Sequence, residues 1–83
     1  MSPHWGQDAL QRAMLARLYA VGGGMTAHDL CNDLRCTMRA LLTALRAQYR
    51  LGNVKRGDAI MLTASARFAI SAAGAPLDWR MAA

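Results

Sequence analysis

The sequence contains no glutamate and few aromatic side chains. All five acidic residues are Asp, against ten Lys and Arg residues, so the formal net charge is +5 and the sequence pI is about 10.3. A balance this basic favours polyanionic partners. The chain is rich in Ala and Leu, with 54% hydrophobic residues. This composition predicts a helix-dominated globule and argues against a disordered chain.

The sequence also lacks long apolar runs. Charged residues interrupt the apolar stretches well short of the ~20 residues that a membrane span requires, so we expect no membrane partner. The first letters, MSPHWGQD, contain no basic segment followed by an apolar run, which argues against a secretory signal. Two cysteines in apolar surroundings, Cys31 and Cys36, suit reduced core thiols. We therefore expect a cytoplasmic protein.

No arrangement of residues typical of catalysis or of metal binding is present. Paired acid and base groups, a phosphate-cradling loop and a nucleophile beside a His are all missing, so we expect no enzyme and no cofactor. The triplet Gly22-Gly23-Gly24 has no following Lys-Ser/Thr and is interpreted as a helix stop. His28, Cys31 and Cys36 match no strong zinc or iron–sulfur signature, and core packing is the preferred interpretation of these cysteines over a sensor site.

Eighty-three residues allow one domain, residues 1–83, with a core that is marginal for a monomer. We therefore expect a homodimer, held by the first helix and the tail. Apolar periodicity and turn residues predict a mainly α fold with a small β-hairpin (α+β), in the order α-α-α-β-β-α. The expected segments are a lead-in at 1–7, helices at 8–21, 26–34, 37–50 and 64–73, a hairpin at 53–63 and a tail at 74–83.

The helix starts have recognisable capping residues. Asp8 with Gln11 resembles a capping box for the first helix, Thr26 with Asp29 gives the same signature for the second, and Thr37 is the natural N-cap of the third. The third helix has no acidic residue near its start, since Ala40 stands there. Its positive end is then open to a phosphate, although Ala40 can also be explained as a good helix former.

Helical spacing predicts which side chains face the core, while Trp5, Leu77 and Trp79 are candidates to pack the two ends of the chain against the body. In the three longer helices the expected inward residues are Leu10, Met14, Leu18 and Val21 in the first, Met38, Leu41, Leu42, Leu45 and Tyr49 in the third, and Phe68, Ala69 and Ala72 in the last. For the hairpin two registers are open. Val54 pairs with Ile60 across a three-residue loop, Arg56-Gly57-Asp58, or with Met61 across a two-residue turn.

Positive charge is concentrated in the middle of the chain. Six of the ten Lys and Arg residues lie between Arg35 and Arg56, and no acidic residue interrupts them, because Asp33 and Asp58 lie just outside. A solvated cationic face would explain such a cluster by itself. Its position on a helix–turn–helix and a hairpin tip favours nucleic acid.

From Leu10 to Arg67 the chain resembles the winged helix-turn-helix domains of bacterial transcription regulators such as the MarR and ArsR families. The matching stretches are MTAHDL before the turn, CTMRALLTAL as the recognition helix, LGNV at the start of the wing and LTASAR leaving it. Three positions depart from the pattern. Arg35 and Ala66 stand where Gly is frequent, and Gln48 occupies a position that is usually apolar.

The resemblance implies that the third helix reads the major groove of double-stranded DNA and that the wing touches the backbone. Five residues would face base edges, with Arg39 as the best candidate for a bidentate contact to guanine: Thr37, Met38, Arg39, Ala40 and Thr43. The expected backbone contacts are Arg35, Arg46, Arg50, Lys55 and Arg56. The function implied is that of a small sequence-specific DNA-binding transcriptional regulator. The alternative is a winged-helix adaptor or inhibitor, of the kind that phages and plasmids encode, whose basic face meets an acidic protein partner and not DNA.

Overall fold

The computed structural model describes residues 5–73 and contains four helices and one hairpin within that range. The elements in chain order are α1 (Gln7–Val21), α2 (Ala27–Leu34), α3 (Met38–Arg50), β1 (Val54–Arg56), β2 (Ile60–Leu62) and α4 (Ala64–Ala73). The expected mainly α class with a small hairpin, and the order α-α-α-β-β-α, are confirmed. Leu77 and Trp79 lie outside the described residues. No helix within 5–73 is long and apolar enough to cross a membrane.

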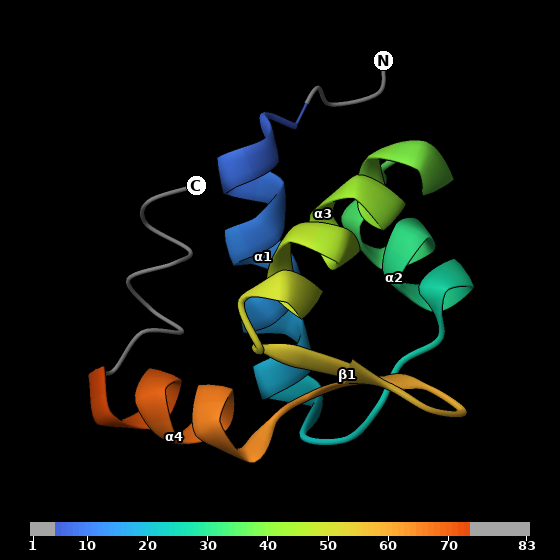
Figure 1. Cartoon of the computed structure of the whole chain (residues 1–83). Helices are drawn as coiled ribbons and strands as arrows, with labels where there is room; N and C mark the ends of the chain where they lie inside the picture. Colours follow the sequence, from blue (N-terminus) through green and yellow to red (C-terminus); the bar gives the residue numbers. More distant parts are fainter. Residues whose placement is uncertain (1–4, 74–83) are drawn as a thin grey trace.

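The core lies where α2, α3 and the hairpin meet α1, which runs through the middle of the molecule (Figure 1). Leu10, Met14 and Leu18 on α1 are fully buried, as their spacing predicts. Val21, expected beside them, is 43% exposed because the helix ends there. The remaining buried apolar residues are Leu15, Leu30, Cys31, Leu41, Ala44, Leu45, Val54, Ile60, Leu62, Ala66 and Ile70.

The first helix starts earlier than its sequence suggests. Gly6 is the N-cap, no side chain caps the helix, and Asp8 lies within the first turn. The expected capping role of Asp8 is therefore wrong, although its charge still stabilises the positive end of the helix dipole. Trp5 fixes the approach to this helix, because its ring is half-buried and its Nε1–H donates to the carbonyl of Leu34 at 2.8 Å.

The glycine triplet ends α1 and also lets the hairpin approach. Gly22 has φ +80, the left-handed conformation in which glycine is favoured. A Cβ on Gly24 would lie 2.5 Å from the Cβ of Ala59, so any larger residue there would displace the hairpin. The following residue, Met25, forms an antiparallel bridge to Ile60, with N–H···O distances of 3.0 and 2.8 Å. One residue of this loop therefore extends the two-stranded sheet.

Threonine caps start both helices of the helix–turn–helix, as the sequence predicts. Thr26 Oγ1 accepts from the Asp29 N–H, and Thr37 Oγ1 accepts from the Ala40 N–H, each at 3.1 Å. Between them Arg35 adopts φ 53 and closes α2 in the left-handed conformation. Glycine is favoured in that conformation, which costs other residues about 1 kcal/mol.

The buried face of α3 differs from the expected one. Leu41, Ala44, Leu45 and Gln48 are buried, whereas three residues expected in the core are exposed: Met38 (41%), Leu42 (37%) and Tyr49 (59%). Gln48 takes part of the buried face instead. Its amide nitrogen and its amide oxygen each form a hydrogen bond in the interior, which offsets the cost of burying them.

The amide of Gln48 belongs to a chain of hydrogen bonds that starts at Asn53, just before the hairpin. The chain passes through Gln48 and two side chains of α1 and ends at a backbone carbonyl near the start of α3. Asn53 Nδ2 donates to Gln48 Oε1 at 2.7 Å, and Gln48 Nε2 donates to Gln11 Oε1 at 2.8 Å. Gln11 then donates to Gln7 at 3.3 Å, and Gln7 donates to the Ala40 carbonyl at 3.2 Å. This amide chain joins α1, α3 and the residue that precedes β1.

The hairpin pairs in a register different from both expected ones. Val54 lies opposite Leu62, Lys55 opposite Met61 and Arg56 opposite Ile60, which leaves Gly57-Asp58-Ala59 as the loop. Both predicted partners of Val54 are wrong because Arg56 is a strand residue and not part of the loop. The odd loop length is right, and it keeps Val54, Ile60 and Leu62 on one buried face.

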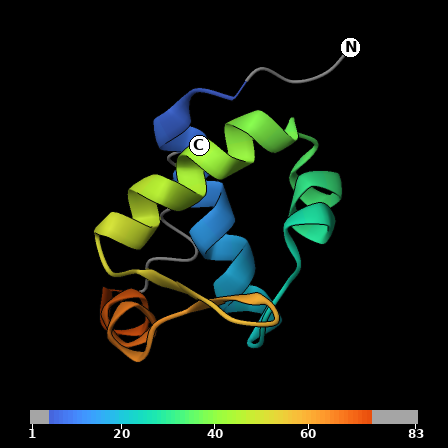
Figure 2. The same ribbon diagram turned by 45° about the vertical axis from the view of Figure 1, so that its right-hand side comes forward.

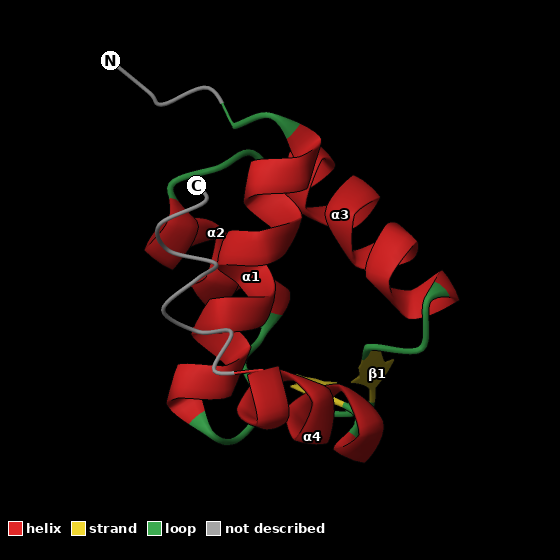
Figure 3. Cartoon of the chain, turned by 90° about the vertical axis from the view of Figure 1, so that its left-hand side faces the viewer, coloured by secondary structure: helices red, strands yellow, loops and turns green. Residues whose placement is uncertain are grey.

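The last helix is fixed at its start by Thr63. The Thr63 hydroxyl donates to the Gly52 carbonyl at 2.8 Å and accepts from the Ala66 N–H at 3.2 Å. Ala66 and Ile70 are buried, so the inward face expected for this helix is wrong: Phe68 is 76% exposed, and Ala69 and Ala72 are exposed as well. The Arg67 guanidinium of α4 lies 5.2 Å from the centre of the Tyr19 ring of α1, and Figure 3 shows α4 beside that end of α1.

Candidate nucleic-acid interface

The side of α3 opposite its buried face carries a row of exposed cations. Arg39, Arg46 and Arg50 recur at helical spacing on that side, and all three are exposed. Arg35 is exposed in the turn before the helix. Lys55 and Arg56 are exposed on β1, in the hairpin that passes beneath α3 (Figure 2). We refer to these six residues as the cationic face.

No acidic side chain neutralises these cations within the described part of the chain. The ion pair that forms there joins Arg17 on α1 to Asp33 on α2 and involves no member of the cationic face. This pairing also occupies the acidic residue nearest to Arg35 in sequence. Asp58 lies in the hairpin loop and is exposed, with no ion pair to Lys55 or Arg56. The surface therefore presents uncompensated positive charge.

The start of α3 is exposed and free of acid. The structure shows no acidic residue in its first turn, in contrast to Asp8 in α1 and Asp29 in α2. Thr37 is exposed at the N-cap, where its hydroxyl holds the Ala40 N–H. Backbone N–H groups and the positive dipole end remain available to an anion there, in keeping with the expectation from sequence.

Two of the proposed base-facing residues have backbone partners of their own. Thr43 is exposed, but its Oγ1 donates to the Arg39 carbonyl at 3.1 Å, which leaves the oxygen free only as an acceptor. Ala40 is half-buried and packs against the core, and its carbonyl accepts from Gln7. Of the expected base-facing set, Thr37, Met38, Arg39 and Thr43 are exposed, and Ala40 is the one turned partly inward.

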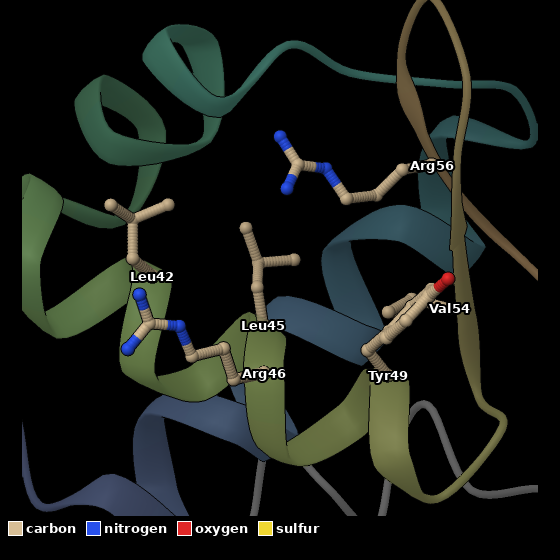
Figure 4. Close-up of a pocket in the computed structure, with 6 residues that line it drawn as sticks. All are labelled: Leu42, Leu45, Arg46, Tyr49, Val54 and Arg56. Carbon is tan, nitrogen blue, oxygen red and sulfur yellow. The ribbon is translucent and has the colours of Figure 1, made fainter.

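A groove separates the cationic face of α3 from the hairpin. Its volume is about 400 Å³, and its walls are formed by Leu42, Leu45, Arg46 and Tyr49 from α3 and by Val54 and Arg56 from β1. Figure 4 shows the Arg56 side chain extending from the hairpin toward the helices. Sequence reasoning missed this groove because it placed Leu42 and Tyr49 in the core. If Gln48 takes a buried position, some of the large apolar residues of α3 have to lie at the surface.

The cysteines adjoin this interface, and Cys36 stands half-buried in the turn between Arg35 and Thr37. Cys31 is buried and its Sγ contacts Met38 Sδ at 3.9 Å. Burial and the neighbouring Cys31 raise the pKa of the Cys36 thiol to about 11, so this thiol is protonated at neutral pH and is a poor nucleophile. Among residues 5–73 no group of three or more His, Cys, Asp or Glu side chains is placed to hold a metal ion.

Comparison with known proteins gives one structural likeness and no sequence match. The structure resembles that of a candidate transcriptional regulator from Pseudomonas aeruginosa PA01, with a TM-score of 0.71 and 20% sequence identity. The likeness covers 94% of this chain and 58% of the other, so this chain spans less than two thirds of that protein's length. No family model matches the sequence, and no curated protein is similar to it.

The element order, the threonine-capped pair α2–α3 and the hairpin held against α3 agree with this likeness. At this level of identity the likeness concerns the fold. The chain has a winged helix-turn-helix fold, in which α2 and α3 form the helix-turn-helix and β1–β2 forms the wing.

Proposed function

We propose that this protein binds double-stranded DNA through α3 and the wing and acts as a sequence-specific transcriptional regulator. The observation that carries the proposal is the cationic face: six exposed Lys and Arg residues that form no ion pair within residues 5–73, placed on α3, on the turn before it and on the wing. The description of the Pseudomonas aeruginosa protein as a candidate regulator supports the same conclusion.

In this proposal α3 enters the major groove. A helix with its side chains is about 10–12 Å wide and the major groove about 12 Å, so the fit is close. Arg39 is the second residue of α3 and is exposed, which suits a bidentate contact to the O6 and N7 atoms of guanine. Thr37, Met38 and Thr43 flank it and would face neighbouring base edges. Ala40 is left out, because its methyl group packs partly against the core.

The other cations would position the domain on the sugar–phosphate backbone. Arg46 and Arg50 continue the row along α3, and Lys55 and Arg56 extend it onto the wing. Arg35 would contact a phosphate near the start of α3. Such contacts supply most of the affinity but carry no base information. The wing strands have three residues each, so most of the sequence discrimination falls to Arg39 and its neighbours.

Binding of labelled duplexes, measured over a range of salt concentrations, tests the proposal. The natural chain should bind a generic duplex at low salt, with log K falling steeply as salt rises, because phosphate contacts release counterions. Arg39→Ala should remove the preference among duplexes of different sequence, at a cost of about 1–3 kcal/mol for the preferred site. Lys55→Ala should weaken binding equally for all sequences and reduce the salt slope by about one.

Arg67→Ala is the matched control, since it removes one positive charge from α4, where Arg67 stacks over the Tyr19 ring at 5.2 Å. It should leave duplex affinity nearly unchanged. Failure of the natural chain to bind any duplex at low ionic strength would refute the proposal.

A further inference from the structure

The cationic face is bordered by an apolar stripe, and two of its residues, Leu42 and Tyr49, have no role in the proposed DNA contacts. Met38, Leu42 and Tyr49 recur at helical spacing along one edge of α3, between the buried face and the row of arginines. They are 41%, 37% and 59% exposed. Phosphates and sugars are bound by N–H and O–H donors, so a wall of Leu and Tyr side chains adds little to backbone contacts. Large apolar side chains gathered at one surface commonly mark an interaction site.

Two residues of this stripe, Leu42 and Tyr49, form part of one wall of the groove between α3 and the wing. Leu45 and Val54 are buried at its base, and Leu42 and Tyr49 stand at its side. Arg46 on α3 and Arg56 on β1 contribute the two positive charges that line it (Figure 4). Neither arginine forms an ion pair with another of the described residues, 5–73. A complementary ligand therefore carries carboxylates next to an apolar side chain.

The shape of the site favours a peptide over a small molecule. From Met38 to Tyr49 the stripe runs about three helical turns, roughly 16 Å, and its side chains remain open to solvent along that length. Sites for small ligands are usually concave and bury most of the ligand. An extended segment of about five residues would span the stripe at ~3.3 Å per residue.

We propose that the groove between α3 and the wing binds a short acidic segment of a partner protein, with one or two large apolar side chains against Leu42 and Tyr49 and carboxylates on Arg46 and Arg56. The segment and DNA cannot bind together, because both use these two arginines. The mutual exclusion of the segment and DNA rests on the proposed function, whereas the peptide site itself does not. The partner would act as an inhibitor of DNA binding.

Fluorescence anisotropy of a labelled synthetic peptide, Asp-Asp-Phe-Asp-Asp-Leu-Asp, tests the site directly on the full chain without DNA. The same peptide with Ser in place of Phe and Leu tests for attraction by charge alone, and a version with Asn in place of Asp tests for apolar contact alone. Each control should bind at least about tenfold more weakly than the parent peptide. Equal binding of the Ser control would mean that only net charge is recognised and would overturn the proposal.

Substitutions on the chain locate the peptide. Leu42→Ser and Tyr49→Ser should each weaken the parent peptide about five- to tenfold, while Val21→Ser, a matched loss of an exposed apolar residue at the end of α1, should have no effect. Circular dichroism confirms that each variant is folded. Peptide affinity unchanged in both groove variants would refute the proposal. Displacement of the peptide by an equal concentration of 2-naphthoate would also refute it, by identifying a small-molecule site.

Competition with a labelled duplex then tests the exclusion of DNA. The parent peptide should displace the duplex from the natural chain, and Leu42→Ser should bind the duplex normally while resisting displacement. Simultaneous binding of peptide and duplex would contradict the inhibitor role. If no duplex binds, the proposed function fails, but the anisotropy measurements still decide whether the peptide site exists.

Discussion

At the scale of single residues, the buried position of Gln48 determines which side chains of α3 are buried and which are exposed. Its side chain is 5% exposed, and both ends of its amide are hydrogen-bonded, to Gln11 and Asn53. Its inward position sets the rotation of α3, which turns Leu42 and Tyr49 outward and leaves Arg39 and Arg50 facing solvent. A position that is usually apolar in similar domains is here the centre of the amide chain.

Gln48→Leu should lower the free energy of unfolding by about 1–2 kcal/mol, because Gln11 Oε1 and Asn53 Nδ2 lose their partners while only partly reaching water. Denaturation with urea measures this change. Adding Gln11→Leu to Gln48→Leu should recover part of the loss, since one of the unpaired groups is then removed. A single Gln48→Leu variant as stable as the natural chain would show that the amide chain contributes nothing.

The residues of the cationic face could be chosen from sequence because charge alone excludes them from the core. Arg39, Arg46 and Arg50 occupy the exposed side of α3 for that reason. Ala40, Leu42 and Tyr49 could not be placed in the same way, because apolar residues near the edge of the buried face are tolerated on either side of that edge. Their positions depend on how α3 packs against α1. The DNA contacts themselves remain predictions.

At the scale of elements, residues close together in the sequence predicted the starts of α2 and α3. They did not predict how the hairpin and α4 pack. The caps at Thr26 and Thr37 depend on hydrogen bonds within a few residues and were correctly expected. The hairpin register was not, because it depends on the Met25–Ile60 bridge and on the space that Gly24 leaves beside Ala59. These contacts join segments far apart in the sequence.

The turn between α2 and α3 combines backbone strain with charge. Arg35 is the one described residue other than glycine with a positive φ. Glycine would relieve a cost of about 1 kcal/mol at this position. Arginine keeps a positive charge beside the start of α3 instead, which is consistent with a phosphate contact in the proposed DNA complex.

At the scale of the whole molecule, α4 carries no residue of the cationic face. The tip of the wing points away from α4, as Figure 1 shows. The outer side of α4 exposes Phe68 at 76%. A single domain of this size has a small core, so burial of further apolar surface is expected to matter for its stability. The sequence suggested a homodimer held by the first helix and the tail, and the tail lies outside the described residues. Because Phe68 is exposed, we propose instead that a second copy of the chain packs against this side of α4, which leaves α3 of both copies accessible.

Sedimentation equilibrium should therefore show a homodimer at micromolar concentration, and Phe68→Ser should shift the equilibrium toward monomer by removing an exposed apolar side chain from the contact. Val21→Ser, an exposed apolar substitution on α1, is the control and should remain dimeric. A natural chain that stays monomeric at high concentration would rule out the dimer.

We propose that duplex DNA contacts α3 and the wing. A proton–nitrogen NMR correlation spectrum of the full chain, recorded during addition of a short duplex at low ionic strength, tests this contact directly. The largest shifts should fall on the backbone amides between Thr37 and Arg50 and on Lys55 and Arg56, with α4 unchanged. Largest shifts on α4, or a spectrum that does not change when duplex is added, would contradict it.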